Sequence, residues 1–173
     1  MKVKKPTFNR SKKTAKQSIN LKSVFGVDFV GKPELRDAIG QAIIDKQRER
    51  TKKNLSYSPG PGRSSRLKSP YSPGYVNSLE FRAAGKKKTD INMELTGDML
   101  GFWDLISDGK NSRNTITQGW DDSTENAKAF RHNTGDKGMP RRPFFGITDS
   151  ELKEIGESRK FKSRLAKMKK DQS

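Results

Sequence analysis

The chain has 173 residues, no cysteine and a formal net charge of +17, with 37 lysines and arginines against 20 aspartates and glutamates. This length is typical of one domain with appendages, and the lack of cysteine excludes disulfide bonds and thiolate metal sites. No run reaches the roughly 18 apolar residues that span a bilayer, so we expect neither a membrane helix nor a signal peptide.

Residues 1–31 are expected to form a basic N-terminal arm, because Asp28 is the first acidic residue of the chain. Such an arm can contact phosphate groups or an acidic protein, or it can stay a solvated tail that aids solubility. The alternation of Phe25, Val27 and Phe29 is compatible with a strand added to a sheet of this chain or of a neighbour. The residues expected to contact DNA or an acidic partner are Lys4, Lys5, Arg10, Lys12, Lys13 and Lys16.

A helix is expected to follow Pro33, whose missing N–H suits the first helical turn, although Lys32 before it is a poor cap. Apolar residues then recur at the spacing of one buried helix face, at Leu35, Ala38, Ile39, Ala42 and Ile43. Residues 45–54 are almost entirely polar. The second half of this helix should therefore project past the core into solvent or toward a partner.

Residues 55–76 are expected to form a long loop, because proline, glycine and serine dominate the stretch. Loops of this length in a compact domain are either functional or mobile linkers. Tyr71 and Tyr75 offer rigid amphipathic contact area within the loop, so we place both at a subunit or partner interface. A mobile insertion is the alternative.

Three strands and a helix are expected in the next part of the chain. Residues 91–95 alternate between apolar and polar, as in a half-buried strand. The stretches 101–107 and 114–120 carry β-branched and aromatic residues and flank a turn-rich segment, which predicts a hairpin. Asp122 or Ser123 then caps a short helix, whose inward face should carry Ala127, Ala129 and Phe130.

The chain is expected to end with a capped helix and a basic tail. Thr148 and Glu151 have the spacing of a capping box, and Leu152 begins an apolar stripe after them. Residues 158–173 are rich in lysine and arginine and are expected to form a C-terminal tail. The domain itself should span residues 32–157 with an α+β fold, in which a small antiparallel sheet packs against the long N-terminal helix and shorter helices.

Few residues qualify as candidates for catalysis. His132 is the single histidine, which excludes a zinc site with two histidines in one chain and favours a polar surface role. Asp104, Asp108, Asp121 and Asp122 could bind a metal or act as an acid–base pair, but acids near turns are more often caps and solvated charges. We therefore expect no enzymatic activity, no metal and no cofactor.

The segment "PRRPFFGIT" (140–148) has the features of an ordered docking segment. Its two prolines hold the chain extended, which lowers the entropy lost on docking. Adjacent residues of an extended chain point to opposite sides, so one of Phe144 and Phe145 should enter the core and the other a neighbouring subunit. For either Phe, a lid that closes the sheet of its own chain is the alternative. The residues placed at a subunit interface are Arg141 and Arg142, which can pair with carboxylates, and Phe144 and Phe145.

Several segments in a fixed order resemble the bacteriophage tail-completion, or virion-morphogenesis, proteins. They are "RLKSPYSPGY" (66–75), "MELTGDML" (93–100), "AFRHNTGDKGMPRRPFFGIT" (129–148) and "DSELKEI" (149–155). Members of that family typically carry a Tyr-Ser pair, a Leu-Thr-Gly-x-[Met/Leu]-Leu stretch, a His-x-x-Gly region and a closing Pro-Ala-Arg-Pro-Phe-Leu-Gly-[Leu/Ile]-[Ser/Thr] before a short acidic helix. The resemblance covers residues 33–157, and the chain departs from the family pattern at Arg141, at Phe145 and in its long cationic N-terminus.

The resemblance implies a structural virion protein, assembled in the host cytoplasm, that forms a homo-oligomeric ring at the head–tail junction and completes the tail or joins it to the neck. A hexamer is favoured by the likeness to tail terminators, and a dodecameric neck ring stays open. The partners would be further copies, neighbouring neck, adaptor or tail-tube proteins, and packaged DNA through non-specific contacts. Subunit contacts would also supply burial that one chain with 29% hydrophobic residues lacks. The alternative is a small basic nucleic-acid-binding protein, although no known nucleic-acid-binding motif is legible.

Overall fold

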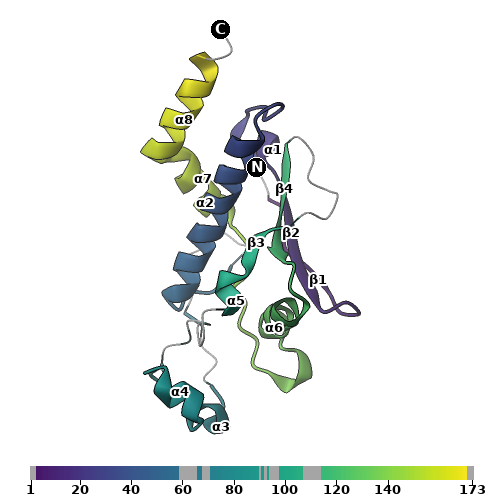
Figure 1. Cartoon of the computed structure of the whole chain (residues 1–173), viewed down its shortest axis with the longest axis vertical. Helices are drawn as coiled ribbons and strands as arrows, with labels where there is room; N and C mark the ends of the chain where they lie inside the picture. The colour runs from purple at the N-terminus through teal and green to yellow at the C-terminus, as the bar shows by residue number, and fades with distance from the viewer. Residues whose placement is uncertain are drawn as a thin grey trace.

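The computed structural model describes residues 3–58, 66–67, 71–89, 91, 93, 98–106 and 114–170, with the backbone alone at 164, 165 and 167–170. Within these residues the chain has the expected α+β fold, in which a small antiparallel sheet is accompanied by one long helix and several shorter ones (Figure 1). The long helix lies along one side of the sheet, and the C-terminal helix extends beyond its end (Figure 1).

The sheet has the strand order β1-β2-β4-β3, and each pair of neighbouring strands is antiparallel. The strands are β1 (Thr7–Asn9), β2 (Thr14–Asn20), β3 (Trp103–Leu105) and β4 (Thr115–Trp120). The expected hairpin is confirmed, because β3 pairs with β4 and places Trp103 opposite Trp120. Its connection, residues 107–113, lies outside the described residues.

The N-terminal segment belongs to the sheet, which corrects the expectation of an arm over residues 1–31. β2 is a central strand, paired with β1 on one side and β4 on the other. It buries every second residue, namely Ala15, Gln17 and Ile19. Because side chains alternate between the two faces of a strand, the lysines of this stretch do not prevent it from forming one.

Residues 21–29 also differ from the expected strand. α1 (Leu21–Phe25) is a short helix, and the side chain of Asn20 caps its first turn. Phe29 is fully buried. Phe25 is half-buried and packs against Phe161 from the C-terminal part of the chain, with 4.7 Å between ring centroids. A helix therefore takes the place of the predicted alternation.

The long helix α2 (Pro33–Lys52) begins as expected, with Pro33 in its first turn and no side-chain cap from Lys32. Gly40 allows this helix to approach the sheet closely. A Cβ atom at Gly40 would lie 2.8 Å from the side chain of Leu105 and 3.2 Å from that of Ile116. These separations are shorter than ordinary van der Waals contacts, so a larger residue there would push the helix outward.

The polar half of α2 is buried, so the prediction that it projects past the core is wrong. Its inward face continues beyond Ile44 through Gln47, Arg50 and Thr51. Ala42, expected on the buried face, is exposed. Buried polar groups are tolerated where they have hydrogen-bond partners, and those of Gln47 and Arg50 form the centre of the site described below.

Short helices replace parts of the expected loop and strand. α3 (Pro73–Val76) and α4 (Leu79–Ala83) each begin after a serine that caps the first turn. The end of the expected loop 55–76 is therefore helical. α5 (Asp98–Gly101) occupies the end of the stretch 91–100, and the residues that should form a strand there lie mostly outside the described residues.

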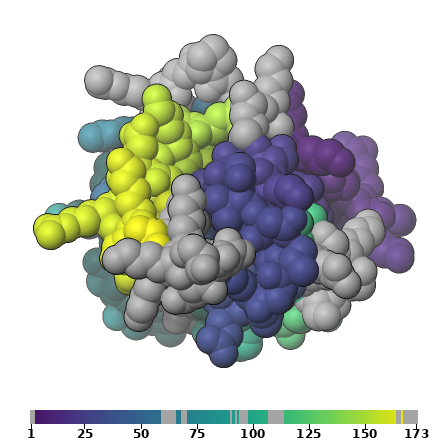
Figure 2. Space-filling view, turned by 90° about the horizontal axis from the view of Figure 1, so that it is seen from above, coloured from purple at the N-terminus to yellow at the C-terminus, as the bar shows by residue number. Residues whose placement is uncertain are grey.

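The C-terminal third contains α6 (Ser123–Thr134), the 3-10 turn η1 (Asp136–Gly138), α7 (Asp149–Glu157) and α8 (Arg159–Lys170). Two expected helix starts are confirmed: Asp122 caps α6, and Thr148 and Glu151 form a capping box on α7. The expected basic tail after residue 157 continues as helix α8. Figure 2 shows α7 and α8 beside α2, with the β1–β2 hairpin on the opposite side of α2.

Two clusters of buried apolar residues hold these elements together. The first lies where α6, β3 and β4 meet the segment before α7, and its large members are Trp103, Trp120, Phe144 and Phe145. The second joins α1, α2, β2, β4, α7 and α8, through Ile19, Leu21, Phe29, Ile39, Ile43, Ile116, Leu152 and Phe161.

Candidate functional site: a clamped closing segment beside a cationic cavity

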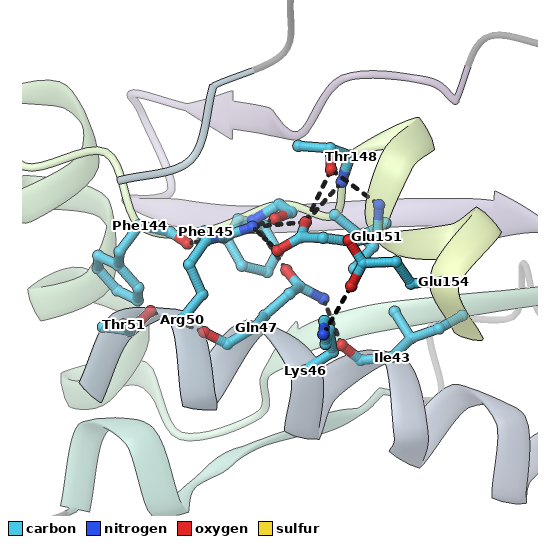
Figure 3. A network of polar contacts seen from close by, with 12 residues as sticks. Ile43, Lys46, Gln47, Arg50, Thr51, Phe144, Phe145, Thr148, Glu151 and Glu154 are labelled. Atoms are coloured by element: carbon cyan, nitrogen blue, oxygen red, sulfur yellow. Dashed lines mark hydrogen bonds and ion pairs between the residues drawn. The ribbon is translucent and has the colours of Figure 1, made fainter. Parts of the chain in front are cut away.

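The closing segment, residues 139–148, runs without regular secondary structure between η1 and α7. Buried side chains from four other elements bind its backbone, and Figure 3 shows those that come from α2 and α7. Each N–H group from Phe144 to Thr148 donates to a side-chain oxygen. The acceptors in chain order are Asn133 for Phe144 and Phe145 at 2.9 and 3.0 Å, Gln47 for Gly146 at 2.9 Å, Gln17 for Ile147 at 3.0 Å and Glu151 for Thr148 at 2.9 Å.

Arg50 holds the same segment from its carbonyl side (Figure 3). Its guanidinium donates to both carboxylate oxygens of Glu151 at 2.7 Å, to the Phe144 carbonyl at 2.5 Å and to the Gly146 carbonyl at 2.8 Å. Burial lowers the pKa of Arg50, and the Glu151 carboxylate partly opposes that shift. A buried ion pair of this kind fixes geometry, because losing one partner leaves a buried charge uncompensated.

Three glutamines keep the acceptor oxygens oriented. The Gln47 side-chain amide donates to Gln118 at 2.8 Å, and that of Gln118 donates to Gln17 at 2.8 Å. All three are buried, and they come from α2, β4 and β2. The N–H₂ groups also donate to backbone carbonyls, that of Gln47 to Ile43 and that of Gln17 to Lys4. These bonds fix the orientation of the two amides, so that their oxygens can accept from the closing segment.

Phe144 and Phe145 are both fully buried in one cluster, so the expectation that they point to opposite sides is wrong. The neighbouring strands β3 and β4 present Trp103 and Trp120 as a stacked pair, 5.2 Å apart. Phe145 lies 5.2 and 5.1 Å from these two rings, and Phe144 lies 6.0 and 6.1 Å from them. Both Phe rings therefore pack against the same pair of indoles, and the next residue, Gly146, has a φ of 126°. In this chain neither Phe is available to another subunit.

The two arginines of the segment differ in their surroundings. Arg141 is exposed, and its Nε donates to the Asn133 carbonyl at 3.3 Å. Arg142 is only 3% exposed, and its guanidinium carbon lies 5.1 Å from the ring centroid of Tyr71. Burial lowers the pKa of Arg142, while Tyr71 and Tyr75 act in the opposite direction. Of the two, Arg141 is the one whose side chain is exposed.

A cavity of about 540 Å³ lies beside the closing segment and brings together Tyr71, Tyr75 and Arg142, which were predicted as interface residues from distant parts of the sequence. Tyr71, Tyr75 and Phe81 form an aromatic cluster with ring centroids 5.1 to 5.6 Å apart. Lys86 lies 5.1 Å from the Tyr71 centroid and its Nζ is 3.2 Å from the Tyr71 hydroxyl. This edge of the cavity is therefore both aromatic and cationic.

Helix α6 forms the facing wall through Glu125, Lys128 and His132, which share one helix face. Lys128 pairs with Glu125 Oε1 at 2.5 Å. Glu125 is 6% exposed, and its other oxygen, Oε2, has no hydrogen-bond partner among the described residues. Its neighbour in the cavity, His132, was expected on the surface, but it is partly buried. Burial and the charge of Arg142 lower the pKa of His132 to about 4, so the ring is neutral at pH 7, and its buried Nδ1 likewise has no partner in the described part of the chain.

The predicted cationic contacts of the N-terminus lie along the β1–β2 hairpin. Lys4, Lys5, Arg10 and Lys12 are exposed. Lys13 instead binds Asp136 at 2.7 Å and lies 5.2 Å from the Phe130 ring centroid, so it joins the hairpin to the turn after α6. The sixth residue of this set, Lys16, is partly buried on β2.

The acidic candidates for chemistry have structural roles where the structure describes them. Asp122 caps α6, and Asp104 accepts from the N–H of Leu105 at 2.7 Å. Asp121 is exposed, and Asp108 lies outside the described residues. The described residues contain no group of three or more His, Asp or Glu side chains that could hold a metal ion. Among them, no helix is both long and apolar enough to cross a membrane.

Comparison of the chain with protein-family models, with curated proteins and with solved structures gives no match. The site is therefore interpreted from its own residues. Several of those residues were not singled out in the sequence, and the most important are Gln17, Gln47, Arg50, Gln118, Glu125 and Asn133. The one sequence signal that could have identified any of them is the helical spacing of Gln47 and Arg50, which continues that of Ile39 and Ile43.

Proposed function

We propose that this chain is a non-enzymatic structural component of a bacteriophage particle, located at the head–tail junction. It forms a homo-oligomeric ring that completes the tail or joins it to the neck. A hexamer is the favoured ring, and a dodecamer is the second possibility. Its partners are further copies of itself and the neighbouring neck, adaptor or tail-tube proteins, with non-specific contact to packaged DNA.

The observation that carries this proposal is the closing segment, which contains "PRRPFFGIT", one of the ordered segments of the family-like pattern. In this chain the segment has a fixed backbone, because buried side chains bind every N–H from Phe144 to Thr148. A segment fixed in this way presents Arg141 and the adjacent cavity in one geometry. Such pre-organisation lowers the entropy cost of binding a partner.

Exposed apolar side chains support contacts between copies. Leu79 on α4 is 81% exposed, and Phe102 between α5 and β3 is 57% exposed. Single exposed apolar residues are common on monomers, but these two lie at different elements and so offer two separate apolar contacts. In a ring built from heterologous contacts, a patch on one copy meets a different patch on the next, and repetition of that contact closes the assembly.

The second candidate is a small basic protein that binds nucleic acid. Two observations favour it: the net charge of +17 and helix α8, in which seven of the 12 residues are lysine or arginine and none is acidic. Cations of this density give salt-sensitive affinity for phosphate without sequence choice. Together with the exposed lysines of the β1–β2 hairpin, α8 could contact a polyanion.

Light scattering distinguishes the two candidates. The mass of the purified full chain is measured at low and high salt, with and without duplex DNA. The virion proposal predicts a discrete ring-sized species that forms without DNA and persists in high salt, because its subunit contacts bury apolar surface. A species that gains mass only with duplex DNA and loses it in high salt would instead support the nucleic-acid candidate.

A further inference from the structure

The cavity beside the closing segment combines positive charge with an adaptable apolar lining. Among the described residues of its lining, Lys86, Lys128, Lys137 and Arg142 are cationic, and Asp98 and Glu125 are acidic. Its apolar surface comes from tyrosine, methionine and proline, namely Tyr71, Tyr75, Met93, Met99, Met139 and Pro140. Methionine is flexible and polarizable, so a lining of this kind adapts to aliphatic or aromatic side chains. The cavity therefore favours a ligand that carries both apolar groups and negative charge.

The wall on α6 adds a requirement for hydrogen-bond donors. Glu125 Oε2 and His132 Nδ1 are buried and have no partner among the described residues. A buried polar atom without a partner destabilises the fold, and an occupant that supplies the missing hydrogen bond offsets that cost. An extended peptide offers one backbone N–H and one carbonyl per residue, so it can donate to Glu125 and also meet His132.

Nucleic acid fits the cavity less well than a peptide. The Glu125 carboxylate needs a hydrogen-bond donor, which a peptide N–H supplies and the oxygen of a phosphodiester does not. Lys86 and Arg142 both lie over the Tyr71 ring, each 5.1 Å from its centroid, and Tyr75 contacts the rings of Tyr71 and Phe81. These contacts leave less of the aromatic surface open for base stacking.

We propose that this cavity binds an extended acidic peptide segment of a neighbouring virion protein. An apolar side chain of the peptide packs among Tyr71, Tyr75 and Met99, its backbone N–H donates to Glu125, and its carboxylates meet Lys137 and the other cations of the rim. The identification of the neighbour as a virion protein rests on the proposed function. The peptide chemistry rests on the cavity alone.

Fluorescence anisotropy with defined peptides tests this inference on the full chain. The probe is a fluorescein-labelled peptide in which glutamate and leucine alternate. The comparison peptides replace glutamate by lysine or leucine by alanine, and a labelled oligothymidine represents single-stranded nucleic acid. The pocket variants are Lys137→Glu and Tyr75→Ala. The matched control is Lys162→Glu, which makes the same charge change at an exposed residue of α8.

The expected result is saturable binding of the Glu-Leu peptide that is at least about tenfold weaker for Lys137→Glu and for Tyr75→Ala, and within about threefold of wild type for Lys162→Glu. Thermal melts of each variant exclude loss of folding as the cause, and the surface variant Lys137→Glu keeps the test decisive if Tyr75→Ala unfolds. Both comparison peptides should bind at least about tenfold more weakly than the probe.

Three results would overturn the inference: no saturable binding of the peptide, equal losses for Lys162→Glu and Lys137→Glu, or oligothymidine binding that depends on the pocket variants while peptide binding does not. These results leave the proposed function untouched if the chain still forms a ring by light scattering. Conversely, pocket-dependent peptide binding by a chain that forms no ring would count against the proposed function and leave the peptide site standing.

Discussion

Replacing Phe145 with alanine separates its two possible roles, a core residue of its own chain or an interface residue of a ring. The structure places this side chain in full burial against Trp103 and Trp120, with Phe8 at 6.3 Å on its other side. Truncation of a buried Phe to Ala typically costs about 3–5 kcal/mol, because it loses transfer free energy and leaves a cavity. We therefore expect a loss of that size in the free energy of unfolding.

The loss is large relative to the total stability of a domain, which is about 5–15 kcal/mol. For a chain of this length each kcal/mol shifts the melting temperature by about 2–4 °C, so Phe145→Ala should lower it by about 6–20 °C. Urea denaturation of the isolated protein, followed by tryptophan fluorescence, measures the free energy directly because Trp103 and Trp120 line the same cluster. The slope of the transition should stay unchanged.

Phe102→Ala is the matched control, because Phe102 is 57% exposed and packs against no other aromatic ring in the described part of the chain. It should change the free energy of unfolding by less than about 0.5 kcal/mol. If Phe145→Ala lowered the free energy of unfolding by less than about 1 kcal/mol while ring formation was lost, Phe145 would be an interface residue and not a core residue.

Three further predictions concern the clamp and the cavity. Arg50→Met should lower the free energy of unfolding by about 3–5 kcal/mol, because it leaves Glu151 buried and unpaired. The double variant Arg50→Met/Glu151→Met should recover much of that loss. Urea denaturation of the three proteins measures this, and an equal loss in the double variant would contradict it. Gly146→Ala should lower the melting temperature strongly, because the added Cβ would lie 2.9 Å from the Tyr57 ring and the backbone there has a φ of 126°. Gly74→Ala is the control and should leave the melting temperature unchanged, because a Cβ at Gly74 meets nothing within 4 Å. The pKa of His132 is about 4 in the folded chain and about 6.5 when unfolded. His132 therefore leaves the free energy of unfolding unchanged above pH 6.5 and lowers it by up to about 3 kcal/mol as the pH falls from 6.5 to 4. A stability–pH profile that stays the same in His132→Gln would contradict this assignment.

Local signals in the sequence predicted the helix starts. The capping box of Thr148 and Glu151 and the cap at Asp122 each involve residues three positions apart, so their interactions can be inferred without knowledge of the fold. The hairpin of β3 and β4 was also predictable, because its aromatic and β-branched residues flank a turn-rich segment.

The buried polar half of α2 was not predictable, because its partners are distant in sequence. Gln47 binds Gln118, which is 71 residues away, and Arg50 binds Glu151, which is 101 residues away. A polar residue whose partner is unknown looks like a solvent-exposed one. The same reason explains His132, because Arg142, which lines the same cavity and lowers its pKa, belongs to the closing segment and not to its own helix.

The N-terminal hairpin was missed because charge dominated its interpretation. Ala15, Gln17 and Ile19 have the period of a strand, but lysines interrupt the apolar pattern. The cations that flank β1, namely Lys4, Lys5 and Arg10, suit its position at the edge of the sheet, since charged residues discourage pairing with further strands. The candidate interface was predicted in part: Tyr71, Tyr75 and Arg142 do meet at one cavity, whereas Phe144 and Phe145 belong to the core.

Locating the protein in purified phage particles tests the central claim most directly. A small epitope tag is fused to the full chain by editing the genome that encodes it. Gold-labelled antibody against the tag is then imaged on purified particles by electron microscopy. The account predicts label concentrated at the head–tail junction, with the tagged protein retained through purification in high salt. Particles that are complete and infectious but contain none of the protein would contradict it.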